Sequence, residues 1–195
     1  LLEKKFVYLH NNTCKKIPSM KKMIISLREL LCKTTYNKEK RVIHGDFHPP
    51  NIIEKNNKEL GLVDYADVSY GEDVCWDAGK WLNYVKRFHV VANARDNILC
   101  VQSNKLNQGG RYIEVECATN SNIDLEKIED GVFGAMYDLA EVRNHDFRTK
   151  ALISEVSVNL LTLPRHIKFF PHAVPLVLAC LCDSYLQLIE HIKKL

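Results

Sequence analysis

The sequence has no long uninterrupted run of apolar residues. Its most apolar stretch, residues 169–181, contains Pro171, His172 and Pro175 and is closed by Asp183. It therefore falls short of the roughly 18 residues that a membrane-spanning helix needs. A secretory signal is also missing at the N-terminus. We expect a cytoplasmic protein with no membrane partner.

The sequence also lacks a disulfide framework and a strong charge of either sign. Its seven cysteines are odd in number and contain no CxxC pair. Four of them lie in apolar periodic runs: Cys32, Cys75, Cys180 and Cys182. We interpret these as buried, reduced thiols. The net charge, 27 basic minus 24 acidic residues, is +3, which gives no argument for a nucleic-acid partner.

With 195 residues, 46% of them apolar, the chain has enough material for one globular domain with its own core. Apolar residues at helical spacing dominate the sequence. They predict helices over residues 20–33, 74–91, 124–144, 146–163 and 173–194.

Shorter segments predict strands. Residues 41–43, 51–54 and 60–64 have strand composition, and the turn residues 55–58 make the last two a β-hairpin. Residues 68–73 should form a loop, and Pro164 should end or kink its helix. Residues 93–122 are harder to interpret, although a turn at 107–110 and an alternating stretch at 112–117 allow a second hairpin.

Two short stretches carry the side chains that can do chemistry. Asp46 and Asn51 are five residues apart, and Asp64 follows thirteen residues later. Because Asn51 and Asp64 flank the predicted hairpin, they should meet in space. Their hard oxygen atoms suit Mg²⁺, and a carboxylate such as that of Asp46 can orient a hydroxyl and accept its proton. The pattern is typical of phosphoryl transfer, with Asp46 as catalytic base and Asn51 and Asp64 as metal ligands.

The sequence of residues 41–82 resembles the aminoglycoside phosphotransferase and choline-kinase-like family of small-molecule kinases. The resemblance rests on three motifs, His44-Gly45-Asp46-Phe47-His48-Pro49-Pro50-Asn51, Leu62-Val63-Asp64-Tyr65 and Trp76-Asp77-Ala78-Gly79. It implies a predominantly helical α/β fold, namely the C-terminal lobe of a protein-kinase-like enzyme with a small hairpin and a helical bundle. It also implies transfer of the γ-phosphate of ATP, or GTP, to a hydroxyl of a small polar molecule with the help of Mg²⁺.

Three further residues have expected roles, and only that of Asp77 is implied by the resemblance. Asp77 stands where the family has a buried aspartate that braces the catalytic loop through hydrogen bonds. His44 is expected to hold the same loop in place. His48 is a candidate for contact with the substrate or the phosphate.

The sequence departs from the family in two ways. Pro50 replaces the glycine that usually precedes the loop asparagine. Only about 40 residues precede the motif, and no glycine-rich phosphate loop is recognisable among them. We expect a single C-lobe domain: a lead-in helix in residues 1–40, catalytic and metal-binding loops in 41–92, and an acceptor-binding helical part in 93–195. The N-lobe would then lie on an upstream segment or on another chain, and this chain, which starts at Leu1, would be a fragment.

Two alternatives use the same residues. His44, Asp46 and His48 alternate, so a local strand could aim all three at one Zn²⁺ or Fe ion, as in a metal-dependent hydrolase. The chain could instead be a non-catalytic kinase-like fragment or scaffold. The lack of an N-lobe favours that interpretation, and the intact set of Asp46, Asn51 and Asp64 argues against it.

The acceptor is less defined. Acidic residues are plentiful in the predicted helix after residue 120, namely Asp124, Glu126, Glu129, Asp130, Asp138 and Glu141. An acid-lined pocket would suit a cationic acceptor such as an aminoglycoside or a choline-like amine. A solvated helix surface explains the same acids equally well.

Overall fold

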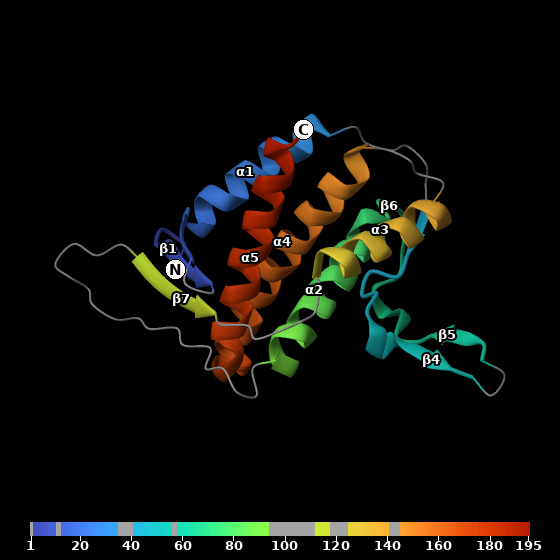
Figure 1. Cartoon of the computed structure of the whole chain (residues 1–195). Coiled ribbons are helices and arrows are strands. Elements are labelled where there is room, and N and C mark those ends of the chain that lie inside the picture. Colours follow the sequence, from blue (N-terminus) through green and yellow to red (C-terminus); the bar gives the residue numbers. More distant parts are fainter. Residues whose placement is uncertain are drawn as a thin grey trace.

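The computed structural model describes residues 2–10, 13–34, 41–55, 58–93, 112–117, 125–140 and 145–195. Helices form most of this part of the chain, and the fold is mixed α/β and mostly helical, as predicted. The described residues contain the helices α1 Met20–Lys33, α2 Cys75–Asn93, α3 Leu125–Ala140, α4 His145–Phe169 and α5 Val174–Lys193 (Figure 1). All five predicted helices are thus confirmed, with shifts of a few residues at some ends.

The helix α1 shows why sequence periodicity predicted these elements well. Met20, Met23 and Leu27 are spaced three and four residues apart and are buried on one face of the helix. Ser19 occupies the N-cap position with an extended backbone, although its side chain makes no capping hydrogen bond. The helix begins and ends where the apolar pattern begins and ends.

The helix α4 lies between α2 and α5 and packs against both (Figure 1). Its contact with α2 is close because Gly79 faces Ser154. A Cβ atom at Gly79 would lie 2.5 Å from the Cβ of Ser154, so glycine lets the two backbones approach. On the other side, α5 contributes the fully buried Leu181 and Leu188 to the core. Each such side chain stabilises the fold by about 1.5–3 kcal/mol.

The sequence interpretation found no apolar stretch long enough to span a membrane, but one segment of the described chain, Pro171–Lys193, does meet that criterion by length and composition. It comprises α5 and the short turn before it. Half of its most apolar window is buried inside the fold, and the core helix of a globular protein meets the same criterion.

The N-terminal strands were not predicted. β1 Lys5–His10 pairs antiparallel with β2 Thr13–Ile17 and parallel with β7 Tyr112–Cys117, which gives the order β2-β1-β7. The side chain of Phe6 in β1 is fully buried in the core. Residues 1–40 therefore contain more than a lead-in helix, because backbone hydrogen bonds join them to the C-terminal half of the chain. The strand expected at 112–117 is confirmed, but its partner is β1, and the turn expected at 107–110 lies outside the described residues.

The hairpin expected near the catalytic motif is confirmed. β4 Ile52–Glu54 pairs antiparallel with β5 Leu60–Leu62, with Ile52 opposite Leu62. The hairpin projects from the helices on the side opposite β7 (Figure 1). A turn of 3-10 helix at Pro49–Asn51 leads into it, so the two adjacent prolines set the direction in which the chain enters β4.

The loop predicted at 68–73 was wrong, and the helix does not end at Pro164. β6 Ser69–Glu72 occupies the expected loop at 68–73, because it pairs antiparallel with β3 Arg41–Ile43. The helix α4 continues through Pro164 to Phe169. Pro164 is exposed, whereas the neighbouring Leu163 is buried in the core. Tertiary packing of this turn thus outweighs the hydrogen bond that the proline removes.

A buried group of charges joins four helices. Lys86 of α2 is only 4% exposed, and its Nζ lies 2.7 Å from Glu129 of α3 and 2.9 Å from Glu155 of α4. It also donates to Gln187 of α5. Burial alone would lower the pKa of Lys86, but the two carboxylates raise it above its usual value. Lys86 is therefore a charged lysine at the centre of the helical bundle.

Candidate active site

The segment after β3 turns sharply at Gly45, which has a φ of +80°. A Cβ atom here would lie 2.2 Å from the backbone oxygen of Asp67. Both the left-handed backbone and the close approach require glycine. The turn sends His44 into the interior, where it is 6% exposed, and leaves Asp46 partly accessible.

Asp77, in the first turn of α2, holds this loop. Its carboxylate accepts hydrogen bonds from the backbone N–H of His44 at 2.7 Å and of Gly45 at 2.9 Å. The neighbouring Trp76 adds a third contact, because its Nε1 donates to the carbonyl oxygen of Gly45 at 2.9 Å. Burial raises the pKa of Asp77 above its usual value, and the two amide donors oppose that shift. These are the hydrogen bonds that the family resemblance implies for Asp77.

Changing Asp77 to Ala should destabilise the loop and the protein. Both amide donors would lose their acceptor in a buried position, and each unsatisfied group costs about 1–3 kcal/mol. Chemical denaturation of the two proteins would measure the loss. Asp77→Asn is the matched control, since its amide oxygen can still serve one donor and should retain part of the stability. Equal denaturation midpoints for wild type and Asp77→Ala would contradict the bracing role.

Asn51 connects the loop to the hairpin. Its side chain is buried, and Nδ2 donates to the backbone oxygen of Asp46 at 2.9 Å. The backbone carbonyl oxygen of Asn51 accepts from the backbone N–H of Val63 at 3.0 Å. Because Nδ2 is engaged with the loop, Oδ1 is the end of the amide that remains for a cation.

Asp64 follows Val63 directly, and Val63 is held from both sides. Its N–H donates to Asn51, and its carbonyl accepts from Nε2 of His44 at 2.9 Å. Asp64 itself is exposed and has a left-handed backbone, with φ 61° and ψ 63°. This conformation is uncommon outside glycine, although Asp tolerates it. The structure thus places Asp64 one residue from the hydrogen bonds that link His44, Asn51 and Val63.

The carboxylate of Asp46 is flanked by a lysine and a histidine side chain. Lys80 of α2 lies 2.8 Å from Oδ1, and Nε2 of His48 lies 3.2 Å from Oδ2. Burial alone would raise the pKa of Asp46, but the ion pair with Lys80, helped by His48, holds it below its usual value. The ring of His48 in turn stacks on Tyr84, with ring centres 5.2 Å apart. Asp46 is therefore ionised and fixed in orientation.

Lys80 was missed by the sequence interpretation. It lies three residues after Asp77 in the same helix, and residues at that spacing share a helix face. Asp77 was expected to face the catalytic loop. Because Lys80 lies on the same face of the helix, it could have been expected to face the loop as well.

The three residues of the hydrolase alternative do not form a metal site. Nε2 of His44 is already engaged with the carbonyl of Val63. In the described part of the chain, no group of three or more His, Cys, Asp or Glu side chains could hold a metal ion. A site made of Asn51 and Asp64 has only two protein ligands, which is usual for Mg²⁺.

The acids considered for a cationic acceptor are engaged elsewhere where the structure describes them. Glu129 pairs with Lys86 at 2.7 Å, and Asp130 pairs with Arg148 at 2.9 Å. The remaining four either lie outside the described residues or have side chains that the structure does not describe: Asp124, Glu126, Asp138 and Glu141. The cavity that Glu129 lines also contains Arg148, His191 and Lys194, so it is not acid-lined.

Comparison with known proteins supports the family resemblance. Residues 13–98 match the model of a phosphotransferase enzyme family, APH. The match begins at β2 and includes the catalytic loop, the hairpin and α2. No curated protein and no solved structure matches the chain.

Proposed function

We propose that the chain transfers the γ-phosphate of ATP, or GTP, to a hydroxyl of a small polar molecule. The starting point is that residues 13–98 are a domain of the phosphotransferase enzyme family (APH). One observation carries the proposal. Asn51 donates to the backbone of Asp46 and accepts from the backbone of Val63. Through its side chain and its backbone, Asn51 therefore holds Asp46, the candidate base, close to the segment that carries Asp64.

In this proposal Asp46 orients the acceptor hydroxyl and takes its proton. Its ionised state suits that role, and the flanking Lys80 and His48 limit its rotation. A carboxylate has about four lone-pair positions, so two contacts leave room for a hydroxyl donor. Phosphoryl transfer needs positioning and charge neutralisation more than covalent help, and these residues supply the positioning.

Asn51 and Asp64 would hold Mg²⁺. The donor set fits this ion, because Oδ1 of Asn51 and the exposed carboxylate of Asp64 are hard oxygen ligands. When bound, the ion neutralises negative charge on the phosphates. Neither side chain is drawn away by an ion pair with a lysine or arginine in the described part of the chain.

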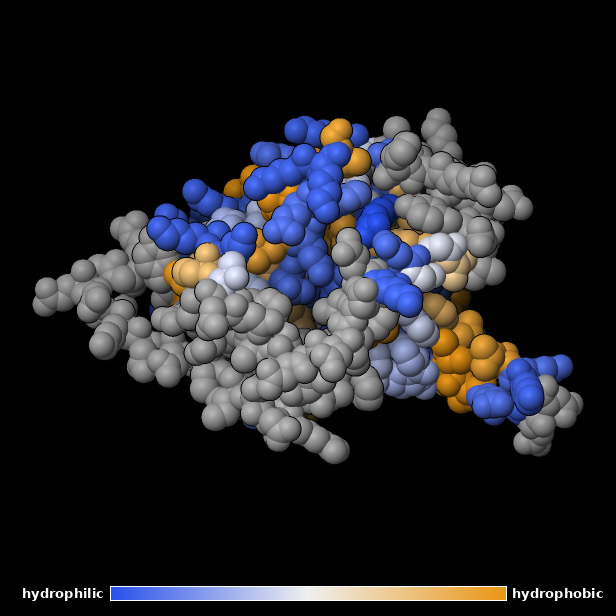
Figure 2. Space-filling view, viewed as in Figure 1, coloured by the Kyte–Doolittle hydropathy of each residue, from blue (hydrophilic) through white to orange (hydrophobic). Residues whose placement is uncertain are grey.

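In this proposal the nucleotide also needs an ATP-clamping lobe, and the described residues do not include one. Apolar side chains gather on the projecting hairpin and its base (Figure 2). They are exposed and lie on both sides of Asp64: Ile53, Leu60, Leu62, Tyr65 and Val68. A surface patch of this kind marks a contact site, and in this proposal an ATP-clamping lobe covers it. That lobe belongs to an upstream segment or to another chain.

A cytoplasmic location is part of the same proposal. The cysteines whose side chains the structure describes are free thiols. Cys75, Cys180 and Cys182 are buried as expected, but the prediction was wrong for Cys32, which is exposed on α1. Reduced thiols and a nucleotide triphosphate as co-substrate both fit that compartment.

Changing Asp64 to Ala should abolish binding of Mg²⁺-nucleotide. The change removes one of only two protein ligands, and the one that carries charge. Titration calorimetry with MgATP measures the effect on the full-length gene product. Glu59→Ala is the matched control, because it removes another exposed acid from the same hairpin.

The calorimetric result separates the proposal from its main alternative. Mg²⁺-dependent binding that Asp64→Ala removes and Glu59→Ala retains would support the phosphotransferase. Absence of Mg²⁺-dependent nucleotide binding in the wild type would favour the non-catalytic scaffold. Equal heats for wild type and Asp64→Ala would exclude Asp64 as a ligand.

A further inference from the structure

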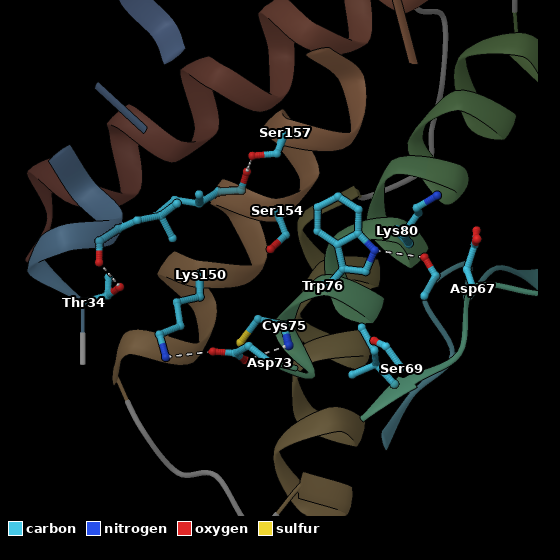
Figure 3. A pocket seen from close by; sticks show the side chains of 14 residues that line it. Thr34, Asp67, Ser69, Asp73, Cys75, Trp76, Lys80, Lys150, Ser154 and Ser157 are labelled. Carbon is cyan, nitrogen blue, oxygen red and sulfur yellow. Dashed lines mark hydrogen bonds and ion pairs between the residues drawn. The ribbon is translucent and has the colours of Figure 1, made fainter. Parts of the chain in front are cut away.

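A cavity of about 640 Å³ opens beside the catalytic loop (Figure 3). Its walls come from the end of α1, the first turns of α2, the middle of α4, and strands β3 and β6. A volume of this size is typical of small-molecule sites. None of the roles assigned above uses it.

The cavity borders the candidate catalytic base. Gly45 and Lys80 both line it, and Lys80 lies 2.8 Å from the carboxylate of Asp46. Trp76 forms part of the same wall, and its indole is fixed by the hydrogen bond from Nε1 to Gly45. A ligand in the cavity would therefore contact a rigid aromatic side chain and lie one side chain away from Asp46.

Two hydroxyl groups in the cavity are available to a ligand. The side-chain hydroxyls of Ser69 and Ser154 make no hydrogen bond with the described part of the chain. Ser154 points into the cavity between Lys150 and Trp76 (Figure 3). Ser157 and Thr34 differ, although they border the same space. Ser157 donates to the carbonyl of Ile153 at 2.8 Å, and Thr34 donates to that of Leu31 at 2.9 Å.

Both lysines that line the cavity are already paired. Lys150 pairs with Asp73 at 2.9 Å, and Lys80 pairs with Asp46 at 2.8 Å. Asp67, the other lining acid, is exposed to solvent. A polycationic ligand would thus have to displace lysines that are already paired, and an anionic one would have to displace their carboxylates.

From these contacts we infer that the cavity binds a neutral, hydroxyl-rich ring, such as a sugar or a cyclitol. The apolar face of such a ring can lie on Trp76, and its hydroxyls can exchange hydrogen bonds with Ser69 and Ser154. The identification of this ligand as the phosphate acceptor rests on the proposed function. The inference that the cavity binds such a ring does not depend on that function.

Binding of sugars to the full chain, without nucleotide, tests the inference. The probes are D-glucose and myo-inositol, with kanamycin and choline as cationic competitors, measured by ligand-observed NMR. Ser154→Ala should weaken binding of the neutral probes about 3- to 10-fold, which is the loss expected for one hydrogen bond. Ser157→Ala is the matched control on the same helix, and it should change affinity less than 2-fold, since its hydroxyl is already engaged.

Three results would overturn the inference: no binding of either neutral probe, tighter binding of kanamycin or choline, or equal sugar affinity in wild type and Ser154→Ala. Equal melting temperatures of the two serine variants ensure that a loss reflects the site. Transfer of labelled γ-phosphate is scored separately. Sugar binding without transfer would support the cavity assignment and count against the proposed function, whereas transfer to an amine-bearing acceptor alone would do the reverse.

Discussion

Replacing Asp46 with Asn should lower the turnover number about 10²- to 10⁴-fold, the usual contribution of a general base. The amide has the same shape and can still accept a hydrogen bond from Lys80, so the loop should keep its position. It cannot take the proton of the acceptor hydroxyl. The KM for the nucleotide should change little, because Asp46 is not assigned to the metal or the phosphates. Steady-state kinetics on the full-length gene product measure both quantities.

The structure offers a control for this experiment in Asp67. Asp67→Asn removes an exposed acid near the same loop, and the backbone oxygen of residue 67, which faces Gly45, is unchanged. It should reduce turnover far less than Asp46→Asn. Wild-type turnover in Asp46→Asn would exclude Asp46 as the base, and the chemistry would then have to be sought elsewhere in the fold.

The candidate site could be proposed from the sequence because the residues that define it are close together in the chain. Asp46 and Asn51 lie within one loop, and the hairpin that brings Asp64 back is closed by a short turn. The same holds for α1, whose buried face follows from residues three and four apart. Asp77 could be assigned from its motif, although only the structure shows which amides it holds.

Contacts between distant segments could not be predicted. β1 pairs with β7, which lies about 100 residues further along the chain. The sequence of neither strand indicates which strand it pairs with. β6 is four residues long and becomes a strand only because β3 lies beside it. Pro164 shows the same limit in a helix, where burial of Leu163 overrides a local rule. In each case tertiary packing decided a structure that local propensity left open.

The assignment of charged residues met a similar limit. Glu129 was considered as part of an acceptor pocket or a solvated helix surface, and it is instead buried against Lys86. Sequence spacing cannot distinguish these outcomes, because the partner lies on another helix. Buried lysines and glutamates are rare unless they are paired, so the pair becomes visible only when α2, α3 and α4 are placed together.

Changing Lys86 to Met should destabilise the protein by about 3–5 kcal/mol, which is the usual effect of removing one member of a buried ion pair. The methionine fills a similar volume, so loss of packing is a minor part of the effect. Glu129 and Glu155 would remain buried with no cation at hydrogen-bond distance. Denaturant unfolding measures the change. Lys22→Met, at an exposed position in α1, is the matched control and should stay within about 0.5 kcal/mol of wild type.

The pH dependence of this effect identifies its cause. Burial raises the pKa of Glu155 to about 7, against an ordinary value of 4.5, even with Lys86 lowering it. An acid whose pKa is raised by folding stabilises the native state below its unfolded pKa, and this contribution is lost as pH rises through the folded pKa. Without Lys86 the pKa of Glu155 should rise further, so the destabilisation should be larger at pH 8 than at pH 5. The double variant Lys86→Met with Glu155→Gln should recover part of the stability at pH 8. A loss independent of pH, with no recovery in the double variant, would show that Lys86 acts through packing and not through its charge.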